Sequence, residues 1–308
     1  MSGPELPVVT CIVLTWNGGT QVQRTLHSLR ESAGVVANII LVDNGSCDAS
    51  AEESRSVAPG ATLIQLNHNI GAAAARNIAL ASALRNTTDY VFFLDDDAFC
   101  ASDCIQQLVE AVQVYEDVGI VTPRIFSAGK NSTIWYDGGE ADVSGDTRHR
   151  NFHKRVSDLP PGANDMSQIA FATSCAMLVS RRALDATGLF DERYFVYCED
   201  ADFSFRVRAA GFRILHLPSA VVWHEQSRDT KNNRGKWFRD YYITRNTLLL
   251  MRDHVHGLSR AMFVLTFAVR RLLIPLTFFL VTLEFRRIGA MAIGIVDFVR
   301  GRVGGRYS

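Results

Sequence analysis

Four apolar runs in the first hundred residues each end in polar side chains, and this pattern limits the folds open to the chain. The runs are VVTCIVLTW (8–16), NIILVDN (38–44), ATLIQLN (61–67) and YVFFLDDD (90–97). Helix-forming segments separate them, including the Ala-rich stretch 71–84. Near-continuous apolar strands separated by helices predict an α/β fold with a mostly parallel sheet flanked by helices. Since ligands bind beyond the carboxyl ends of such strands, we expect the polar ends to share one crevice.

Three consecutive carboxylates, Asp95, Asp96 and Asp97, follow the fourth apolar run. They would repel one another unless a cation lay among them, and Mg²⁺ or Mn²⁺ suits oxygen ligands. Residues at i and i+2 of an extended segment point the same way, so Asp95 and Asp97 are expected to share the ion while Asp96 faces elsewhere. The alternative is a solvated turn in which Asp97 is a helix N-cap.

A glycine and an arginine stand at the start of the Ala-rich helix. Gly71 allows close packing, and a helix N-terminus with Arg76 one turn later would favour a phosphate or carboxylate. The alternative is an Ala-rich packing helix with a surface arginine. The pattern G-x-x-x-x-G-K-[ST] is absent from the sequence, so a P-loop is excluded.

A second acidic cluster, Glu199, Asp200 and Asp202, lies at a predicted helix start. Acidic residues in a first turn complement the helix dipole, but a carboxylate beside a metal site could also act as general base. His224 follows an apolar strand 24 residues beyond Asp200. Such a histidine is commonly a satisfied core residue, and only a link to the carboxylate triplet would make it a ligand.

Charge divides the chain into two unlike parts. The formal net charge is zero, which gives no indication of nucleic-acid binding, yet residues 252–308 carry +6 and residues 1–251 carry −6. We predict a catalytic domain over 1–228 and a basic, amphipathic helical extension over 229–308. The six cysteines form no CxxC pair and are expected to be reduced thiols, and the first 17 residues lack a signal-peptide pattern.

The extension holds short apolar segments interrupted by arginine pairs. They are residues 261–269, 272–283 and 288–296, none of which reaches the 18 residues from which a spanning helix is considered. Such segments suit helices in the membrane interface, where arginine contacts anionic headgroups. The alternatives are helices that cover the catalytic domain, a dimer surface, or a re-entrant or tilted span over 261–283.

Together these segments resemble the inverting glycosyltransferases of family 2, which have the nucleotide-diphospho-sugar fold called GT-A. The matching pieces are VVTCIVLTWNGG, IILVDNGSCDAS, NHNIGAAAARN, FFLDDDAF and FDERYFVYCEDADFSFRVRAAGF with its trailing WHEQS, over residues 8 to about 227. The resemblance implies a nucleoside pocket lined by Thr15, Asn17, Asp43 and Asn44, and a nucleotide-sugar side with Gly71, Arg76 and Asp96. It implies metal ligands Asp95, Asp97 and His224, and Asp200 as catalytic base, with Asp202 as the second candidate.

The resemblance also implies a reaction. The enzyme would move a sugar from a nucleoside-diphosphate sugar to a lipid-linked or polysaccharide acceptor, with inversion, at the cytoplasmic face of the cell membrane. The stretch DYYITRNTLLLMRDHV resembles rhamnosyl- and related transferases that build bacterial surface polysaccharide. A sugar nucleotidyltransferase and a catalytically silent sugar-binding protein stay open as alternatives, as does a homo-oligomer.

Overall fold

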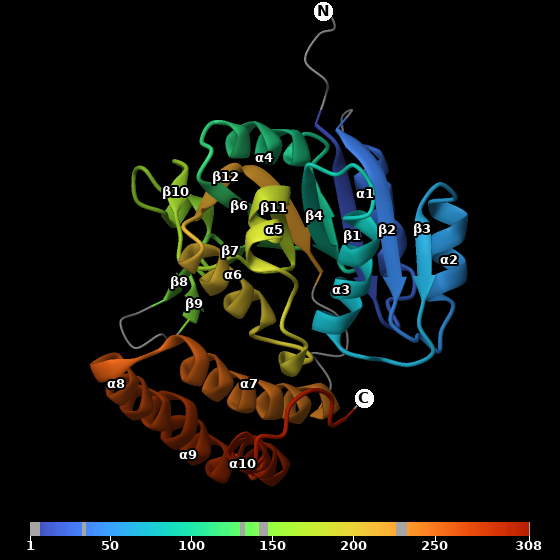
Figure 1. The fold of residues 1–308 in the computed structure, drawn as a ribbon. Helices are drawn as coiled ribbons and strands as arrows, with labels where there is room; N and C mark the ends of the chain where they lie inside the picture. The colour runs from blue at the N-terminus through green and yellow to red at the C-terminus, as the bar shows by residue number, and fades with distance from the viewer. Residues whose placement is uncertain (1–6, 33–34, 130–132, 142–146, 226–232, 308) are drawn as a thin grey trace, which may run out of the picture.

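The protein is built around a ten-stranded mixed sheet (Figure 1). The structure, a computed structural model, describes residues 7–32, 35–129, 133–141, 147–225 and 233–307. In sheet order the strands are β10 (Ser167–Gln168), β12 (Arg213–His224), β6 (Val118–Ser127), β11 (Ala176–Ser180), β4 (Tyr90–Asp95), β1 (Val9–Thr15), β2 (Val36–Asp43) and β3 (Thr62–Gln65), while β5 (Ala98–Cys100) pairs with β12 and β7 (Ile134–Tyr136) pairs with β6. A separate hairpin is formed by β8 (Gly139–Ala141) and β9 (Thr147–His149).

The first half of the sheet is parallel, as the sequence predicts. β1 lies parallel to both β2 and β4, and β2 lies parallel to β3. β11 then runs antiparallel between β4 and β6, and β12 returns parallel to β6. Valine, isoleucine and phenylalanine of the apolar runs fill the core, because the central strands β1, β2 and β4 are covered on both faces, whereas the edge strand β3 is only partly buried.

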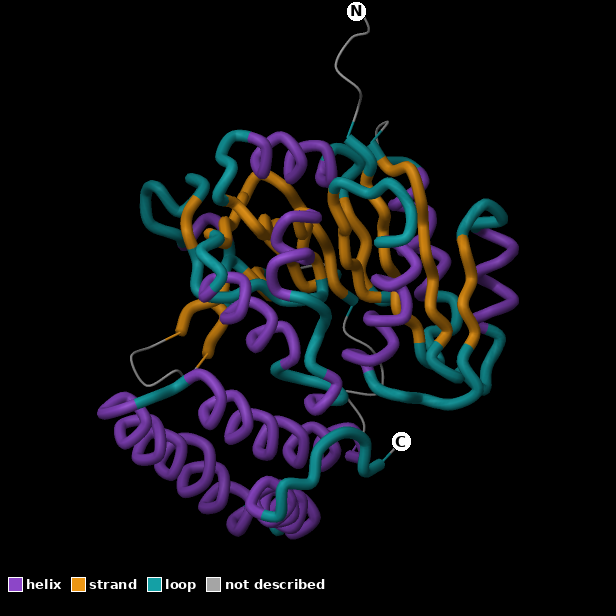
Figure 2. Tube along the Cα trace, in the orientation of Figure 1, coloured by secondary structure: helices purple, strands orange, loops and turns teal. Residues whose placement is uncertain are grey.

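Helices cover the sheet and connect its strands (Figures 1 and 2). They are α1 (Gln21–Arg30), α2 (Ser50–Val57), α3 (Ala72–Ala83), α4 (Cys104–Gln113), α5 (Arg181–Thr187) and α6 (Glu199–Ala209), with the short 3₁₀ turns η1 (Val156–Asp158) and η2 (Glu192–Tyr194). In Figure 1, α3, α5 and α6 lie in front of the sheet. The predicted α/β architecture with flanking helices is confirmed.

The C-terminal extension is a group of helices below the sheet in Figure 1. It comprises α7 (Asn233–His254), α8 (Gly257–Phe267), the π-helical η4 (Ala268–Leu273), α9 (Ile274–Val281) and α10 (Phe285–Val299). Helix α10 packs along α7. The predicted division between residues 228 and 229 falls in 226–232, outside the described residues, and it stays a prediction.

One prediction about the extension is wrong. The sequence predicts segments that end at Arg270 and Arg271 and are each too short to span a membrane, with a tilted span over 261–283 as an alternative. The structure instead joins α8, η4 and α9 into one helix over Gly257–Val281, long and apolar enough to cross a membrane by length and composition. Arg270 and Arg271 end a run of consecutive apolar residues, but they do not end the helix, since arginine is a good helix former. Only 11% of the most apolar part of this helix is buried.

Candidate active site

The carboxyl ends of three neighbouring strands bring polar residues to one edge of the sheet. Thr15, the last residue of β1, pairs with Asp43, the last residue of β2. Asp95, the last residue of β4, pairs with the residue before Thr15. The expectation that these ends meet at one edge is therefore confirmed for β1, β2 and β4.

The residues assigned to the nucleoside pocket shape the turns at this edge. Three side-chain oxygens each accept a backbone N–H: Asn17 Oδ1 from Cys47 at 2.9 Å, Asp43 Oδ1 from Ser46 at 2.9 Å and Asn44 Oδ1 from Ile70 at 3.0 Å. Asp43 and Asn44 are almost fully buried. These hydrogen bonds fix the loops that follow β1, β2 and β3. The four residues therefore determine the shape of the backbone at this edge of the sheet.

Each carboxylate of the triplet has a different partner. Asp95 accepts a hydrogen bond from Arg76 at 2.9 Å, and Asp96 accepts one from the Thr15 hydroxyl at 2.6 Å. Asp97 Oδ1 lies 3.0 Å from His224 Nε2. Asp96 and Asp97 form a turn after β4, so the extended-strand alternation used in the sequence argument does not apply to them. Burial, followed by the charge of Asp97, raises the pKa of the Asp96 carboxyl to about 7.

His224 stands beside the triplet, which the sequence alone could not establish. It ends β12 and pairs with Ala98, the residue after Asp97. Burial lowers the pKa of His224, but the hydrogen bond to Asp97 and its charge outweigh burial and raise the pKa above its ordinary value. Its Nδ1 is buried and has no hydrogen-bond partner within the described part of the chain. His224 is therefore not a satisfied core histidine.

The donors gathered here fit a divalent cation. Asp95, Cys175 and His224 offer ligand atoms that lie within 4.8 Å of one another, and Asp97 contacts the same histidine. Carboxylate oxygens with one imidazole nitrogen suit Mn²⁺ or Mg²⁺. The Cys175 sulfur is a soft donor and is a poorer ligand for these hard cations than the carboxylate oxygens. The orphaned nitrogen of His224 supports a ligand at this point.

Arg76 links the triplet to the second acidic cluster. Its guanidinium is buried and contacts Asp95 through Nη2 and Glu199 Oε1 through Nη1, at 2.9 and 2.8 Å. The alternative of a surface arginine is therefore wrong. Burial, then the charge of Asp200, raises the pKa of Glu199 to about 7 despite the arginine. At the start of α3, the N–H of Ala73 donates to Phe195 O at 3.2 Å, so the chain itself occupies part of this helix N-terminus.

The two candidate bases have different surroundings. Asp200 accepts hydrogen bonds only from backbone N–H groups, those of Ala201 at 2.8 Å and Ser174 at 3.3 Å, among the described residues. Burial raises the pKa of its carboxyl. Asp202 instead contacts Arg206 at 2.9 Å and His254 at 2.7 Å, through different oxygens. Both oxygens of Asp202 are thus engaged with cationic or imidazole side chains.

Two aromatic residues near this cluster were not expected from the sequence. The rings of Trp135 and His224 lie 4.5 Å apart, and those of Trp135 and His149 lie 4.9 Å apart. His149 Nδ1 lies 3.0 Å from Trp135 O, so it carries the proton and leaves Nε2 as an acceptor. Both residues lie in the stretch interpreted as long loops, where neither periodicity nor a motif could identify them.

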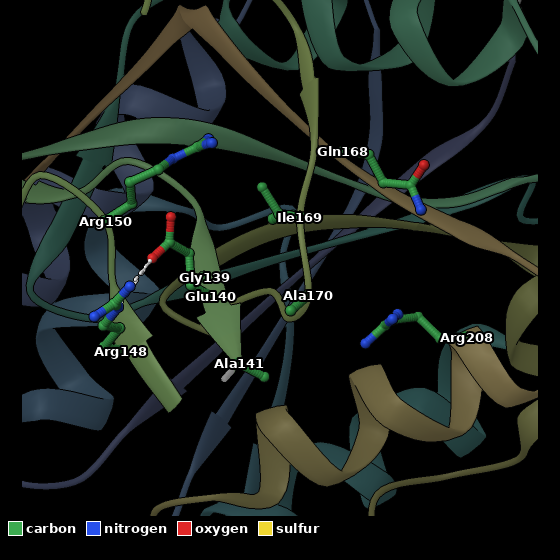
Figure 3. Close-up of a pocket in the computed structure, with 9 residues that line it drawn as sticks. All are labelled: Gly139, Glu140, Ala141, Arg148, Arg150, Gln168, Ile169, Ala170 and Arg208. Carbon is green, nitrogen blue, oxygen red and sulfur yellow. Dashed lines mark hydrogen bonds and ion pairs between the residues drawn. The ribbon is translucent and has the colours of Figure 1, made fainter. Parts of the chain in front are cut away.

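A cavity of about 560 Å³ lies away from the carboxylates, between the β8–β9 hairpin and α6 (Figure 3). Its lining residues are Gly139, Glu140, Ala141, Arg148, Arg150, Gln168, Ile169, Ala170 and Arg208. Arg148 forms an ion pair with Glu140 at 2.9 Å at one side of this cavity (Figure 3). None of the predicted site residues lines it.

Comparison with known proteins agrees with this geometry. The model of "Glycosyl transferase family 2" matches residues 10–188. An N-acetylglucosaminyl-diphospho-decaprenol L-rhamnosyltransferase of Mycobacterium tuberculosis (strain H37Rv) is 25% identical over 272 residues, which are 82% of this chain and 87% of that protein. A pre-mycofactocin glycosyltransferase of the same strain is 28% identical over 227 residues, 73% of this chain and 44% of the relative.

Solved structures share the fold at low identity. GalNAc-T7 with UDP, GalNAc and Mn²⁺ gives a TM-score of 0.60 at 15% identity, covering 81% of this chain and 55% of its own. The mannosyltransferase PcManGT from Pyrobaculum calidifontis with GDP-Man and Mn²⁺ gives 0.58 at 17% identity, covering 96% and 88%. These likenesses show the GT-A fold. Since the family model matches more than half of the residues, the chain belongs to glycosyl transferase family 2 and is a glycosyltransferase.

Proposed function

We propose that this glycosyltransferase is inverting and metal-dependent, and that it moves a sugar from a nucleoside-diphosphate sugar to a lipid-linked or polysaccharide acceptor. The observation that carries the proposal is the link between two acidic clusters: Arg76 joins Asp95, beside His224, to Glu199, beside Asp200. The printed names of the relatives, a diphospho-decaprenol rhamnosyltransferase and a poly-β-1,6-N-acetyl-D-glucosamine synthase, support the acceptor classes.

Asp95, Asp97 and His224 would hold the metal ion. A divalent cation, Mn²⁺ or Mg²⁺, supplies positive charge to a departing diphosphate when bound. Asp97 contacts the imidazole of His224 at 3.0 Å and keeps it in place. Arg76 would not contact phosphate directly, because both of its terminal nitrogens already contact carboxylates. It orients Asp95 and partly neutralises the acidic edge.

Asp200 would be the base that accepts the proton of the acceptor hydroxyl. A carboxyl whose pKa is raised by burial is a stronger base than one in water, and its two backbone hydrogen bonds fix its orientation. Attack by the acceptor oxygen on the anomeric carbon, with loss of the diphosphate, inverts that carbon in one displacement. Asp202 is the weaker candidate because Arg206 and His254 occupy its oxygens.

The remaining assigned residues would form the donor pocket. Thr15, Asn17, Asp43 and Asn44 lie at the carboxyl ends of β1 and β2, and Asp96 lies against Thr15. Its hydrogen bond from the Thr15 hydroxyl, at 2.6 Å, fixes Asp96 at the end of β1 beside the proposed pocket. Gly71 would act indirectly, through its contact with Phe195.

The experiment begins with a panel of nucleotide sugars, in which release of nucleoside diphosphate is measured with Mn²⁺. Asp97→Ala should lose Mn²⁺ binding in calorimetry, whereas Asp200→Asn should keep it and lose turnover. Asp202→Asn is the matched control and should keep turnover. Turnover that survives in Asp200→Asn but fails in Asp202→Asn would reverse the assignment of the base. Formation of a nucleoside triphosphate and a sugar 1-phosphate when pyrophosphate is added to the nucleotide sugar would indicate a nucleotidyltransferase instead.

We further propose that the helix over Gly257–Val281 lies on the cytoplasmic face of the cell membrane. Its outward side is mostly apolar, although Arg260 and Arg270 are also exposed there. The exposed large hydrophobic residues are Leu258, Met262, Val264, Leu265, Val269, Leu273, Ile274, Phe278, Leu280 and Val281. At about 1.5 Å per residue the helix could reach across a bilayer core of about 30 Å. Phe263, Phe267 and Phe279 are nevertheless buried within the protein, which favours a helix with one side in lipid and one on the protein.

Flotation with vesicles of zwitterionic and anionic phospholipid tests this placement. Leu265→Glu with Phe278→Glu should abolish co-flotation, because it puts two charges on the outward side. Val114→Glu is the matched control, since Val114 is 61% exposed, comparable with 68% for Leu265 and 56% for Phe278, but lies at the end of α4. Equal flotation of all three proteins would remove the lipid contact from the proposal.

A further inference from the structure

The backbone immediately before Glu199 and Asp200 is held in an unfavourable conformation. Phe195, Tyr197 and Cys198 have φ values of 64°, 66° and 70°, in the left-handed region that residues with a side chain seldom occupy. Such a conformation is unfavourable for a residue with a side chain and persists only where surrounding structure fixes it. Residues 194–198, called the segment below, lead directly into Glu199 and Asp200. Contacts from outside the segment must therefore hold it in this conformation.

Asn246 of α7 supplies those contacts. Its amide nitrogen lies 2.8 Å from three carbonyl oxygens, those of Tyr194, Val196 and Tyr197. An amide has two N–H groups, so at least one hydrogen is shared between two carbonyls. The Nε of Arg245 donates to Asn246 Oδ1 at 2.9 Å, which fixes the amide with its nitrogen toward the segment.

Arg245 reinforces this arrangement from a fully buried position. Its Nη2 donates to the carbonyl oxygens of Arg193 at 3.2 Å and Tyr194 at 3.0 Å. Its Nη1 donates to Gly304 O at 2.6 Å. Among the described residues its hydrogen bonds go to carbonyl, amide and hydroxyl oxygens, not to a carboxylate. Burying a cation without a carboxylate partner costs free energy. Here the buried guanidinium fixes the orientation of the Asn246 amide and the carbonyl groups of Arg193 and Tyr194.

The segment transmits this hold in two directions. Towards the C-terminus, Cys198 is followed directly by Glu199 and Asp200, the first two residues of α6. Towards α3, Phe195 O accepts the N–H of Ala73, and its ring stacks on Tyr242 of α7 at 5.2 Å. Helix α7 therefore contacts the backbone that leads into Asp200, the proposed base.

We propose that Asn246, oriented by Arg245, is a positioning residue for Asp200. The inference rests on the proposed role of Asp200 as base. In it, α7 is part of the catalytic apparatus, although the family model ends at residue 188. The rival is a purely structural role, in which loss of the amide weakens the fold without a specific effect on the segment.

Asn246→Leu tests the proposal, because leucine has a similar size but cannot donate. The matched control is Asp297→Asn, which weakens the buried contacts of Asp297 with Tyr241 and Arg306 between α7 and the C-terminal end without touching the segment. The first readout is hydrogen–deuterium exchange of amides 194–201 in the full chain. Asn246→Leu should speed this exchange by about fivefold for each hydrogen bond lost, whereas Asp297→Asn should leave it unchanged.

The second readout is kinetic, with the sugar nucleotide found in the panel. Asn246→Leu should lower kcat by about a hundredfold, the effect of a misplacement of about 1 Å, and leave KM for the donor and Mn²⁺ affinity unchanged. Wild-type exchange and kcat in a variant with a lower Tm would overturn the proposal. If Asn246→Leu does not fold, Asn246→Asp replaces it. Aspartate can pair with Arg245 and preserve the fold, but it has no N–H to donate to the carbonyl groups of the segment. Since exchange needs no substrate, an inactive wild type would count against the proposed function only.

Discussion

Substitution of Gly71 by alanine tests whether this residue acts through the segment before Asp200. Gly71 has φ 92° and ψ 160°, a region that is essentially restricted to glycine. A Cβ placed on it would lie 2.4 Å from Phe195 Cδ2 and 2.7 Å from Phe195 O. The ring and the backbone of Phe195 would both have to move, and the backbone is the less able to do so.

The magnitude follows from two separate costs. The backbone conformation costs about 1–3 kcal/mol for a residue with a side chain. Overpacking against Phe195 adds about 1–3 kcal/mol. Gly211 is the control for a positive φ without a clash, because its φ is 91° but a Cβ there would meet no atom within 4 Å. We therefore expect Gly71→Ala to lower the free energy of unfolding by about 1–3 kcal/mol more than Gly211→Ala.

Urea unfolding, followed by tryptophan fluorescence, measures both variants, and diphosphate release measures their turnover. Gly71→Ala should also lose turnover, because displacement of Phe195 moves the chain that leads to Asp200, whereas Gly211→Ala should retain it. Phe195→Ala should restore part of the loss in the double variant, since the ring is one of the two clashing groups. Equal stabilities of the two glycine variants with retained turnover would refute the reasoning.

Two further predictions concern buried carboxylates. Because the pKa of Glu199 is raised to about 7, the folded chain holds its proton more tightly than the unfolded chain. The contribution of Glu199 to the free energy of unfolding is full below about pH 4 and is lost as pH rises through 7. The free energy of unfolding of the wild type should therefore fall by about 3 kcal/mol relative to Glu199→Gln over that interval, and parallel curves of unfolding free energy against pH would contradict this. Burial opposes ionisation of Asp137, but hydrogen bonds from His216 and Arg124 outweigh it and lower its pKa. That stabilisation is present above the ordinary pKa and is lost as pH falls, and Asp137→Asn should cost about 3–5 kcal/mol in urea unfolding at neutral pH, a cost that a surface change such as Asp158→Asn should not have.

The sequence predicted the features that depend on local pattern. Apolar runs in the first hundred residues are strands, and their polar ends meet at one edge because the carboxyl ends of parallel strands lie together. His224 could be linked to the triplet only through the resemblance, since its neighbourhood depends on the antiparallel pairing of β12 with β5. That pairing joins residues more than a hundred positions apart, and no periodicity reports it.

Other features depend on which side chains meet across the fold. The sequence left Arg76 as either an anion ligand or a surface residue of a packing helix. Its burial between Asp95 and Glu199 joins residues 19 and 123 positions away, which no local pattern indicates. The turn after Asp95 removes the alternation on which the first metal argument rested. The continuous helix over Gly257–Val281 corresponds to the alternative of a span over 261–283 and not to the short separate segments, because a helical backbone continues through an arginine pair.

The hydrogen bonds of α7 change how membrane binding should be tested. Removal of the residues after about Lys236 would take away the apolar helix, but it would also remove Arg245 and Asn246, which hold the backbone before Asp200. A truncated protein that neither binds vesicles nor turns over substrate would thus leave the two losses inseparable. Substitutions at Leu265 and Phe278 avoid this, because both side chains face outward. Lost flotation with intact turnover on a soluble acceptor would assign the outer side of the extension to lipid and its inner side to catalysis.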